Sequence, residues 1–489
     1  MIEKQVRTRF APSPTGFLHV GGLRTALYAY LFARHNNGKM ILRIEDTDRE
    51  RLVPGATEHL QEVLYTMGID YDEGPEKGGE YGPYIQSERL DIYKEYAQKL
   101  IDKGEAYYCF CTKERLTEMR ESQIKRKVAP MYDKHCRTLP KEDVEKERSA
   151  GTAYVIRQAI PSDQKISFED AVKGHTAFDS NTLDDHVLMK ADGFPTYHLA
   201  VVVDDHLMEI THVIRGEEWI PSAPKHVALY NAFQWEIPVM AHLPLLLNPD
   251  KTKLSKRQGD VNVEDYLAKG YLKEAIINFI ALLGWHEEKS DREIYSLSEL
   301  IEVFTLERVQ KSGAVFDLQK FEWINTHYIK KLPDNELIEK ILPHLKKEDF
   351  WKENPDTELL TSLLPDIRTR LKTFSEISDT IKIYFRVSPY DKKMFLHEKM
   401  KVTLDMAKQA LTEGIKTLED LPENKFMEED TKEVLLEKIT SLGWKNGQLL
   451  WPMRVALSGE QFSPGVFELL TSLKKEESLN RLKAGLEKF

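Results

Sequence analysis

The pattern of glycine and apolar residues changes once along the chain, near residue 331, and this change limits the folds open to it. Nineteen of the 25 glycines lie before residue 331 and six lie after it. Before that point helical patterns alternate with short β-like runs, namely VRTRFA, KMILRIE, HLAVVV and ITHVIR. Strands that alternate with helices are typical of a parallel α/β sheet. The first two thirds of the chain therefore predict an α/β fold.

The last third of the sequence has a helical pattern instead. Its first apolar residues follow the 3.6-residue period of a helix, and Asp334 stands where it can cap that helix; the residues are Leu337, Ile338, Ile341 and Leu342. Similar runs recur around residues 359–371 and 434–442. We therefore expect residues 331–489 to be all-α.

Composition narrows the class of protein further. The length of 489 residues allows about three domains, and 69 basic minus 80 acidic residues gives a net charge of −11. That balance argues against coating nucleic acid by bulk positive charge, although a local basic groove stays possible. The N-terminus lacks the apolar run of a secretory signal, no stretch approaches the ~20 apolar residues of a membrane span, and there are only three cysteines. We expect a cytoplasmic protein without a membrane partner.

A glycine-rich turn follows the first predicted strand. The segment A-P-S-P-T-G-F-L-H-V-G-G covers residues 11–22 and leads into an apolar helix. A strand, a glycine turn and a helix N-terminus together suit phosphate binding, because free N–H groups and the helix dipole face the ligand. Neither the G-x-G-x-x-G fingerprint nor the P-loop is present. A plain proline-glycine turn at a domain edge is the alternative.

A second candidate segment is K-L-S-K-R, residues 253–257. Lys253 and Lys256 lie three residues apart on a loop that can close over a triphosphate. Their charges would stabilise the negative charge that builds on a leaving pyrophosphate. The alternative is a solvated basic loop.

Together these two segments resemble a known family. H-V-G-G resembles the "HIGH" signature of class I aminoacyl-tRNA synthetases, and K-L-S-K-R, 234 residues later, resembles their "KMSKS" signature. Gly22 replaces the last histidine of the first signature, so that residue's role cannot be transferred. The resemblance implies a Rossmann-like core that uses ATP with Mg²⁺, with His19, Lys253 and Lys256 as catalytic residues. It implies ATP contacts from His19, Gly21, Gly22, Lys253, Ser255 and Lys256.

Charged residues at the ends of predicted strands indicate which amino acid is the substrate. An acidic substrate needs buried positive charge, and Arg9 and Arg215 are the candidates because arginine binds both oxygens of a carboxylate. Glu45 could accept hydrogen bonds from the substrate ammonium, and Ser13 and Tyr197 could add hydrogen bonds. The alternative for each charge is a surface ion pair.

Four segments carry a narrower resemblance: R-F-A-P-S-P-T-G, R-I-E-D-T-D, F-P-T-Y-H-L-A and V-I-R-G-E-E-W are similar to bacterial glutamyl-tRNA synthetases across nearly the whole of the first 330 residues. The resemblance implies a glutamate–tRNA ligase, which forms glutamyl-adenylate from L-glutamate and ATP and transfers the glutamyl group to the terminal adenosine of tRNA(Glu). It also implies that activation needs bound tRNA. We expect the chain to act as a monomer. The implied glutamate-binding residues are Arg9, Ser13, Glu45, Tyr197 and Arg215.

The cysteines form one cluster, Cys109, Cys111 and Cys136. Zinc prefers four ligands, and His135 is an awkward fourth because it adjoins Cys136. The pattern C-x-C…Y-x-x-x-C resembles the zinc site of some bacterial glutamyl-tRNA synthetases, which implies Tyr132 as the fourth ligand of one structural Zn²⁺. Three free cysteines without metal are the alternative.

Asp204, Asp205 and His206 form a second acidic group. If they lie on a strand, neighbours point to opposite faces and rarely converge on one ion. We expect them to have a structural or substrate-proximal role.

The predicted fold is therefore a Rossmann-like core with a zinc-bearing insertion and a helical anticodon-binding region. The expected parts are a catalytic first half (1–108), an acceptor-end-binding insertion (109–185), a catalytic second half (186–250), a stem-contact region with the lysine loop (251–330) and an anticodon-binding domain (331–489). Within the last part, the resemblance implies Arg370 as an anticodon-reading residue, with Arg368 as a rival. The helical third disfavours a glutaminyl enzyme, and the length excludes a shorter tRNA-modifying paralogue. A catalytically silent RNA-binding module is the remaining alternative.

Overall fold

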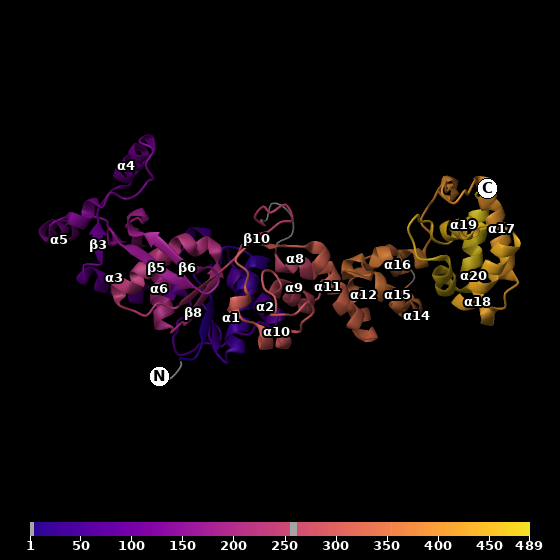
Figure 1. Ribbon diagram of the computed structural model, residues 1–489, viewed down its shortest axis with the longest axis horizontal. Coiled ribbons are helices and arrows are strands. Elements are labelled where there is room, and N and C mark those ends of the chain that lie inside the picture. Colours follow the sequence, from indigo (N-terminus) through magenta and orange to yellow (C-terminus); the bar gives the residue numbers. More distant parts are fainter. Residues whose placement is uncertain (1–3, 255–261, 354) are drawn as a thin grey trace. The chain divides into compact units, whose positions relative to one another are not determined.

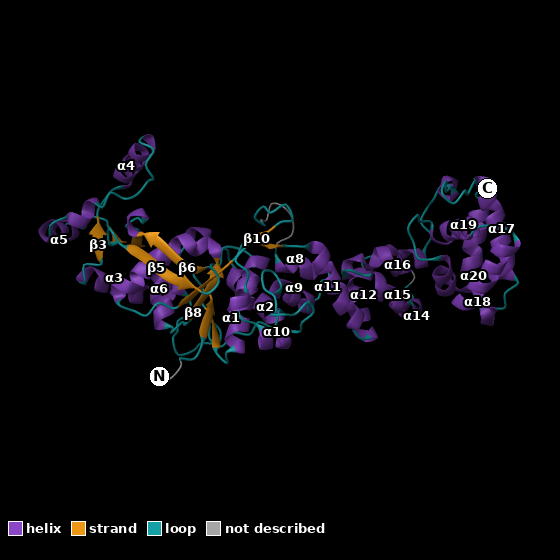
Figure 2. Cartoon of the chain, in the orientation of Figure 1, coloured by secondary structure: helices purple, strands orange, loops and turns teal. Residues whose placement is uncertain are grey.

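The computed structural model describes residues 4–254, 262–353 and 355–489 (Figure 1). The chain forms two compact units, and each is described here by itself. The first comprises Met1–Leu267 and Lys273–Ile324, and the second comprises Ala268–Leu272 and Asn325–Phe489. Among the described residues, all strands belong to the first unit, and the second is built of helices (Figure 2). The predicted class, α/β followed by an all-α region, is confirmed.

A six-stranded sheet with the order β2-β1-β8-β9-β5-β6 forms the centre of the first unit. All neighbouring strands run parallel except β5 and β6, which form an antiparallel pair at one edge. The strands are β1 (Arg7–Phe10), β2 (Lys39–Leu42), β5 (Lys165–Asp170), β6 (Gly174–Asp179), β8 (His212–Gly216) and β9 (Val239–Leu243). Parallel strands bring their carboxyl ends to one edge, which is where open α/β sheets bind ligands.

Burial along the strands reflects their place in the sheet. All four residues of β1 are buried, whereas β5 alternates strictly between exposed and buried residues. A strand covered on both faces needs continuous burial, and a strand near an edge needs it on one face only. The β5–β6 pair lies within the segment 109–185, and it extends the main sheet.

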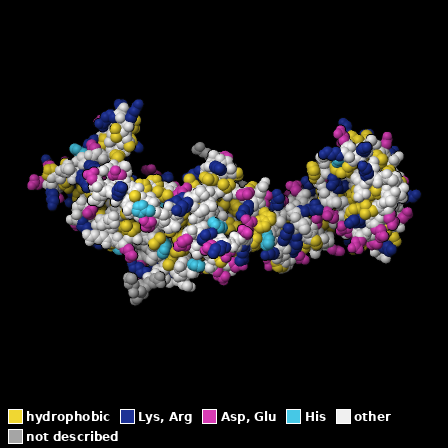
Figure 3. Space-filling model, in the orientation of Figure 1, with side chains coloured by type: hydrophobic (Ala, Val, Ile, Leu, Met, Phe, Trp, Pro, Cys, Tyr) yellow, Lys and Arg dark blue, Asp and Glu magenta, His cyan; other side chains and the backbone are white. Residues whose placement is uncertain are grey.

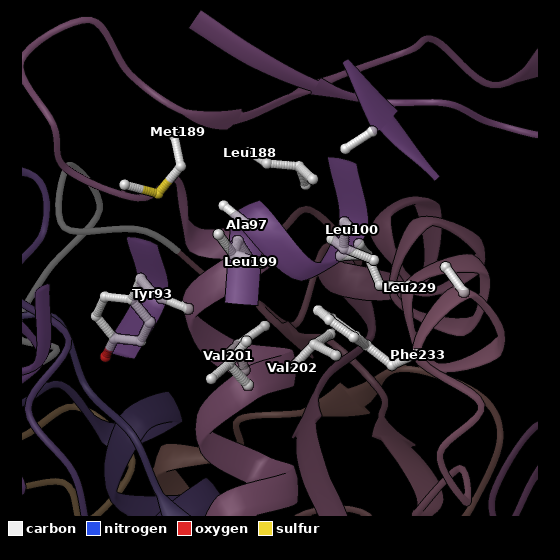
Figure 4. Packing of buried hydrophobic residues seen from close by; sticks show 14 of the residues in the cluster. Tyr93, Ala97, Leu100, Leu188, Met189, Leu199, Val201, Val202, Leu229 and Phe233 are labelled. Carbon is white, nitrogen blue, oxygen red and sulfur yellow. The ribbon is translucent and has the colours of Figure 1, made fainter. Parts of the chain in front are cut away.

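The helices of this sheet are α1 (Val20–His35), α2 (Ala56–Thr66), α3 (Leu90–Asp102), α6 (Tyr197–Leu207) and α7 (Ala223–Phe233). Helices α3, α6 and α7 share one apolar cluster (Figure 4). Its buried residues include Tyr93, Ala97, Leu100, Leu199, Val201, Val202, Leu229 and Phe233.

One predicted strand is wrong. The run HLAVVV, residues 198–203, lies in helix α6, and the five residues from Leu199 to Val203 are all buried. A short apolar run without polar alternation fits a buried helix as well as a buried strand, so its period could not distinguish the two.

A second, three-stranded antiparallel sheet has the order β3-β4-β7. It consists of β3 (Ala106–Cys109), β4 (Val155–Gln158) and β7 (Val187–Met189). Between β3 and β4 the chain forms α4 (Lys113–Lys125) and α5 (Lys141–Ser149), neither of which has a buried residue. The rest of the first unit contributes β10 (Leu246–Leu247), α8 (Val263–Ala268), α9 (Lys273–Ala281), α10 (Leu297–Val303), β11 (Ala314–Val315) and the start of α11 (Leu318–Lys331).

The second unit consists of α12 (Asp334–Leu345), α13 (Asp349–Glu353), α14 (Thr357–Ser362), α15 (Leu364–Arg370), α16 (Ile377–Phe385), α17 (Leu404–Glu419), α18 (Glu428–Ser441), α19 (Asn446–Ser458) and α20 (Val466–Leu486). The predicted cap at Asp334 is wrong: Pro333 is the N-cap of α12, and Asp334, the first helical residue, pairs with Arg368. Trp451 donates a hydrogen bond to the Phe395 carbonyl at 3.0 Å, and Met453 is fully buried, so both belong to the core.

Candidate active site

A cavity of about 930 Å³ opens at the carboxyl ends of β1 and β8. The segments that resemble the two synthetase signatures both contribute to its lining. The predicted site residues that line it are Arg9, Ser13, His19, Gly21, Gly22, Glu45, Tyr197, Arg215 and Lys253. The other two predicted ATP contacts, Ser255 and Lys256, lie outside the described residues.

The glycine-rich turn is built around His19, the N-cap of α1. Its Nδ1 accepts a hydrogen bond from the Gly22 N–H at 3.1 Å. A Cβ added at Gly22 would lie 2.8 Å from the Leu18 side chain, and one at Gly21 would lie 3.0 Å from the His19 ring. A side chain at either position would therefore press on Leu18 or on the His19 ring. The start of the helix borders the cavity, where an anion would benefit from its dipole.

Arg215, at the end of β8, is the most distinctive charge of the cavity. Its Nε donates to His242 Nε2 at 3.0 Å, and its Nη1 lies 3.1 Å from the Tyr197 hydroxyl and 3.2 Å from His226 Nδ1. Only 5% of the residue is exposed, and Nη2 is buried without a hydrogen-bond partner. Within the described residues, no carboxylate lies within ion-pair distance of this guanidinium. A buried, unpaired guanidinium is costly, so the site is arranged for an anionic ligand.

Tyr197 supports this part of the cavity from the first turn of α6. Its ring lies 4.3 Å, centre to centre, from the ring of Trp219. Burial raises the pKa of the Tyr197 hydroxyl, although the charge of Arg215 works against the shift. The hydroxyl therefore stays protonated at neutral pH and can donate a hydrogen bond to a ligand while it accepts one from Arg215.

A second group of buried charges lies beside Arg215, and its members form ion pairs with one another. Arg9 donates to Asp205 at 3.1 Å, and Arg43 donates to Asp205 at 2.8 Å and to Glu45 at 3.0 Å. All four residues are at most 6% exposed. Burial alone would raise the pKa of Asp205, but the guanidinium groups of Arg9 and Arg43 hold it below its ordinary value. At Glu45 burial prevails over the opposing effect of Arg43, and the pKa is raised.

Arg43 and Asp205 were not among the predicted site residues. Arg43 stands two residues before Glu45, a spacing that puts both on one face of an extended segment, so R-I-E carried a usable signal. Asp204 and Asp205 are not strand neighbours, because both lie on helix α6. Asp204 is fully buried and accepts hydrogen bonds from Gln86, Arg89 and Tyr93, which is the structural role expected for this group.

The cysteine cluster lies in the segment between β3 and the 3₁₀ helix His135–Thr138. The sulfur atoms of Cys109, Cys111 and Cys136 lie within 4.8 Å of one another. The Tyr132 hydroxyl lies 3.3 Å from the sulfurs of Cys109 and Cys111. Three sulfurs and one oxygen make up the donor number of a structural zinc site. Among the described residues His135 is not part of this cysteine group, and its side chain is exposed.

In the second unit, Arg370 lines a cavity of about 360 Å³ together with Lys382 and Phe462, whose ring side chain is 88% exposed. Arg370 donates to Glu468 at 2.7 Å and pairs with Asp366. Its side chain is 36% exposed, whereas that of Arg368, paired with Asp334, is 18% exposed. Arg370 is thus the more accessible of the two predicted anticodon-reading candidates.

Comparison with known proteins identifies the family. Residues 5–323 match the family "tRNA synthetases class I (E and Q), catalytic domain", and residues 336–486 match "Anticodon binding domain". A relative named glutamate–tRNA ligase from Clostridium botulinum (strain Loch Maree) is 48% identical over 490 residues, covering 100% of this chain and 99% of the relative. A relative of the same name from Chlorobium luteolum is 47% identical over 501 residues, covering 100% and 98%.

A solved structure gives the same result. The crystal structure of a glutamate tRNA ligase from Elizabethkingia meningosepticum, in complex with its amino acid, matches with a TM-score of 0.86 and 39% identity, covering 99% of each chain. The chain therefore belongs to the class I aminoacyl-tRNA synthetases of the glutamate and glutamine group. Within that group its full-length relatives put it among the glutamate–tRNA ligases, and the predicted family and enzyme class are confirmed. No helix in the described part of the chain is long and apolar enough to cross a membrane.

Proposed function

We propose that the cavity of the first unit activates L-glutamate with ATP, and that Arg215 binds the carboxylate by which glutamate differs from glutamine. The observation that carries this proposal is the buried guanidinium of Arg215, which has neutral partners on two nitrogens and none on the third. Glu45, whose second oxygen is not used by Arg43, would accept hydrogen bonds from the substrate ammonium. Arg9 and Ser13 complete the predicted glutamate contacts along the same wall.

ATP would occupy the part of the cavity beside the start of α1. His19, Gly21 and Gly22 would contact it there, and Lys253, Ser255 and Lys256 would stabilise its phosphates. An oxygen of the substrate α-carboxylate attacks the α-phosphorus, the bond to pyrophosphate breaks, and glutamyl-adenylate forms. A hydroxyl of the terminal ribose of tRNA then attacks the glutamyl carbonyl, loses its proton to solvent, and AMP leaves. Positioning and charge stabilisation supply the rate, because no protein nucleophile takes part. Mg²⁺ would arrive with ATP.

The test is glutamate-dependent exchange between ATP and pyrophosphate, measured with and without tRNA(Glu). We expect exchange with glutamate only when tRNA is present, and no exchange with glutamine. Exchange with glutamine alone would favour a glutaminyl enzyme. No exchange under any condition would favour an RNA-binding module and contradict the proposal.

Cys109, Cys111, Tyr132 and Cys136 would hold one structural Zn²⁺, which would cross-link the end of β3 to Tyr132 and to the 3₁₀ helix that contains Cys136. The guanidinium of Arg157 lies 4.0 Å from the centre of the Tyr132 ring and would offset the negative charge of the thiolates. Metal analysis should find about one zinc per chain, and Cys136→Ser should lose it while His135→Ala, a matched control, retains it. A zinc content below about a tenth of that value, in protein purified without chelators, would favour three free cysteines.

Recognition of tRNA would use a basic surface on an otherwise acidic protein. Arg120, Lys125, Arg126 and Lys127 are exposed on and just after α4, inside the proposed acceptor-binding segment 109–185, where Figure 3 shows a concentration of basic side chains. Segments 251–330 and 331–489 would contact the stem and the anticodon, with Arg370 reading a base. Reversing Arg126 and Lys127 to glutamate should weaken tRNA binding and lower its dependence on salt; affinity that does not change with salt would contradict this surface. We expect the enzyme to act as a cytoplasmic monomer.

A further inference from the structure

Three neighbouring strands of the main sheet bring together residues that are far apart in the sequence. Arg215 of β8 and His242 of β9 are direct partners in the parallel register, and Asp170 ends the next strand, β5. All three side chains are buried, with exposures of 5% or less. Asp170 lies in the segment 109–185, and neither it nor His242 was predicted as a site residue.

The hydrogen bonds of this group determine the tautomer of His242. The Arg215 Nε–H can only donate, so His242 Nε2, 3.0 Å away, must accept. The proton of the neutral ring is then on Nδ1, which donates to Asp170 Oδ2 at 2.5 Å. The other oxygen of Asp170, Oδ1, accepts the N–H groups of Val172, Lys173 and His242 itself. Asp170 cannot rotate without breaking these backbone hydrogen bonds.

A second set of neutral groups holds the other side of the guanidinium. His226 Nδ1 and the Tyr197 hydroxyl both lie within hydrogen-bond distance of Nη1, and His226 Nε2 lies 3.1 Å from His198 Nδ1. Every fixed partner of Arg215 is therefore an uncharged acceptor. These partners hold the plane of the guanidinium in one orientation and leave its positive charge without a counterion until a ligand binds.

We propose that Asp170 and His242 are positioning residues for Arg215, and that the orientation they impose sets the preference for glutamate over glutamine. A fixed guanidinium presents only donors, so it suits both oxygens of a carboxylate and is mismatched to the NH₂ of an amide. A guanidinium that is free to turn could donate to the amide oxygen of glutamine alone, and the preference for glutamate over glutamine would then fall. This inference rests on the proposed activation of glutamate.

Asp170→Asn tests the role of the tautomer. The asparagine Oδ1 would keep the three backbone N–H groups, so its NH₂ would face His242 Nδ1. His242 would then have to accept at Nδ1 and carry its proton on Nε2, directed against the Arg215 Nε–H. A comparable exchange in the serine-protease triad leaves the geometry intact but selects the wrong tautomer. We expect the KM for glutamate to rise at least about tenfold, because a hydrogen bond to a charged group is lost.

The double variant Asp170→Asn, His242→Gln separates this role from a merely structural one. A glutamine has no tautomers, so its Oε1 can accept from Arg215 Nε whichever residue stands at position 170. Relative to His242→Gln alone, Asp170→Asn should therefore raise the KM for glutamate by less than about threefold. Glu73→Gln is the matched control: Glu73 is also buried and accepts from Arg7 and Tyr84, but it does not line the cavity. It should lower stability and leave the KM for glutamate unchanged.

The assay is ATP–pyrophosphate exchange by the full-length, zinc-containing enzyme with tRNA, and it gives the KM for glutamate, the KM for ATP and the ratio of kcat/KM for glutamate and glutamine. The expected result is a raised KM for glutamate and a reduced ratio in Asp170→Asn, with the KM for ATP within about twofold of wild type. Wild-type values in Asp170→Asn, or equal losses in both backgrounds, would overturn the inference. No exchange by the wild-type enzyme would instead contradict the proposed function.

Discussion

The two groups of buried charge in the cavity differ in one respect. Arg9 and Arg43 are paired with Asp205 and Glu45, whereas Arg215 is surrounded by neutral acceptors. Both groups are almost completely buried, so the difference is one of partners and not of exposure. Buried charges that already have partners hold elements together. A buried charge without a charged partner is available to a ligand.

Arg43 and Asp205 do not line the cavity and serve the structure, whereas Arg9 and Glu45 of the same group also line it as proposed glutamate contacts. The paired group connects β1, helix α6 and the segment after β2, which are far apart in the sequence. The Arg215 group connects three strand ends and holds one guanidinium in place. If this interpretation is right, substitutions of Arg43 and of Arg215 will affect different measurements.

The largest expected effect is on glutamate activation by Arg215→Ala. Loss of the guanidinium should reduce kcat/KM for glutamate in the exchange assay by at least about a hundredfold, since two charge-assisted hydrogen bonds to a carboxylate are lost. Direct ATP binding should stay within about twofold of wild type, because the proposed nucleotide contacts lie elsewhere in the cavity. An unchanged KM for glutamate would contradict the assignment of Arg215.

The next effect is on stability. Arg43→Met should lower the free energy of unfolding of the first unit by about 3 kcal/mol, because it leaves buried carboxylates without their partner. Arg215→Met should cost less, since the guanidinium that it removes has no ion pair to break. Denaturant titration of both variants would measure this difference, and equal losses would mean that the two groups do not differ as described.

The smallest effect is on pH dependence. Burial lowers the pKa of His198 to about 4, and the charges of Lys225 and Arg215 act in the same direction. Because the unfolded histidine binds its proton near pH 6.5, His198 should contribute a loss of stability of up to about 1 kcal/mol per pH unit as the pH drops from about 6.5 toward 4. His186 and His226, whose pKa values burial also lowers, add to this loss. The pKa of Asp205 is lowered as well, so its contribution should be lost only below about pH 4.

His198→Gln should reduce the slope of the upper part of the pH profile by the contribution of one proton, and Asp205→Asn should do the same for the lower part. Unfolding titrations at several pH values between 7 and 3 would resolve the two windows. A single shared window would show that the two groups are not independent.

Much of the fold and part of the site could be predicted from the sequence. The strand, the glycine turn and the apolar helix around His19 are consecutive, so local chemistry identified them, and the structure has His19 at the start of that helix. The change of pattern near residue 331 predicted the helical region, and the unit boundary falls at residues 324 and 325. The functional roles of the site residues stay predictions.

The remaining features depend on contacts that no local pattern reports. The run at residues 199–203 is apolar throughout because this part of α6 is buried on all sides, and no period is left that distinguishes helix from strand. Asp170, Arg215 and His242 meet only because of the order and register of three strands. Arg43 could have been found from its spacing to Glu45, whereas His242 follows no motif at all.

The central claim is that the guanidinium of Arg215 selects glutamate by its charge. The most direct test is the ratio of kcat/KM for glutamate and glutamine in tRNA-dependent pyrophosphate exchange, measured for wild type and for Arg215→Met. The account predicts a wild-type preference for glutamate of at least about a thousandfold, and a ratio within about tenfold of one in the variant. A variant that retains the full preference for glutamate would contradict it.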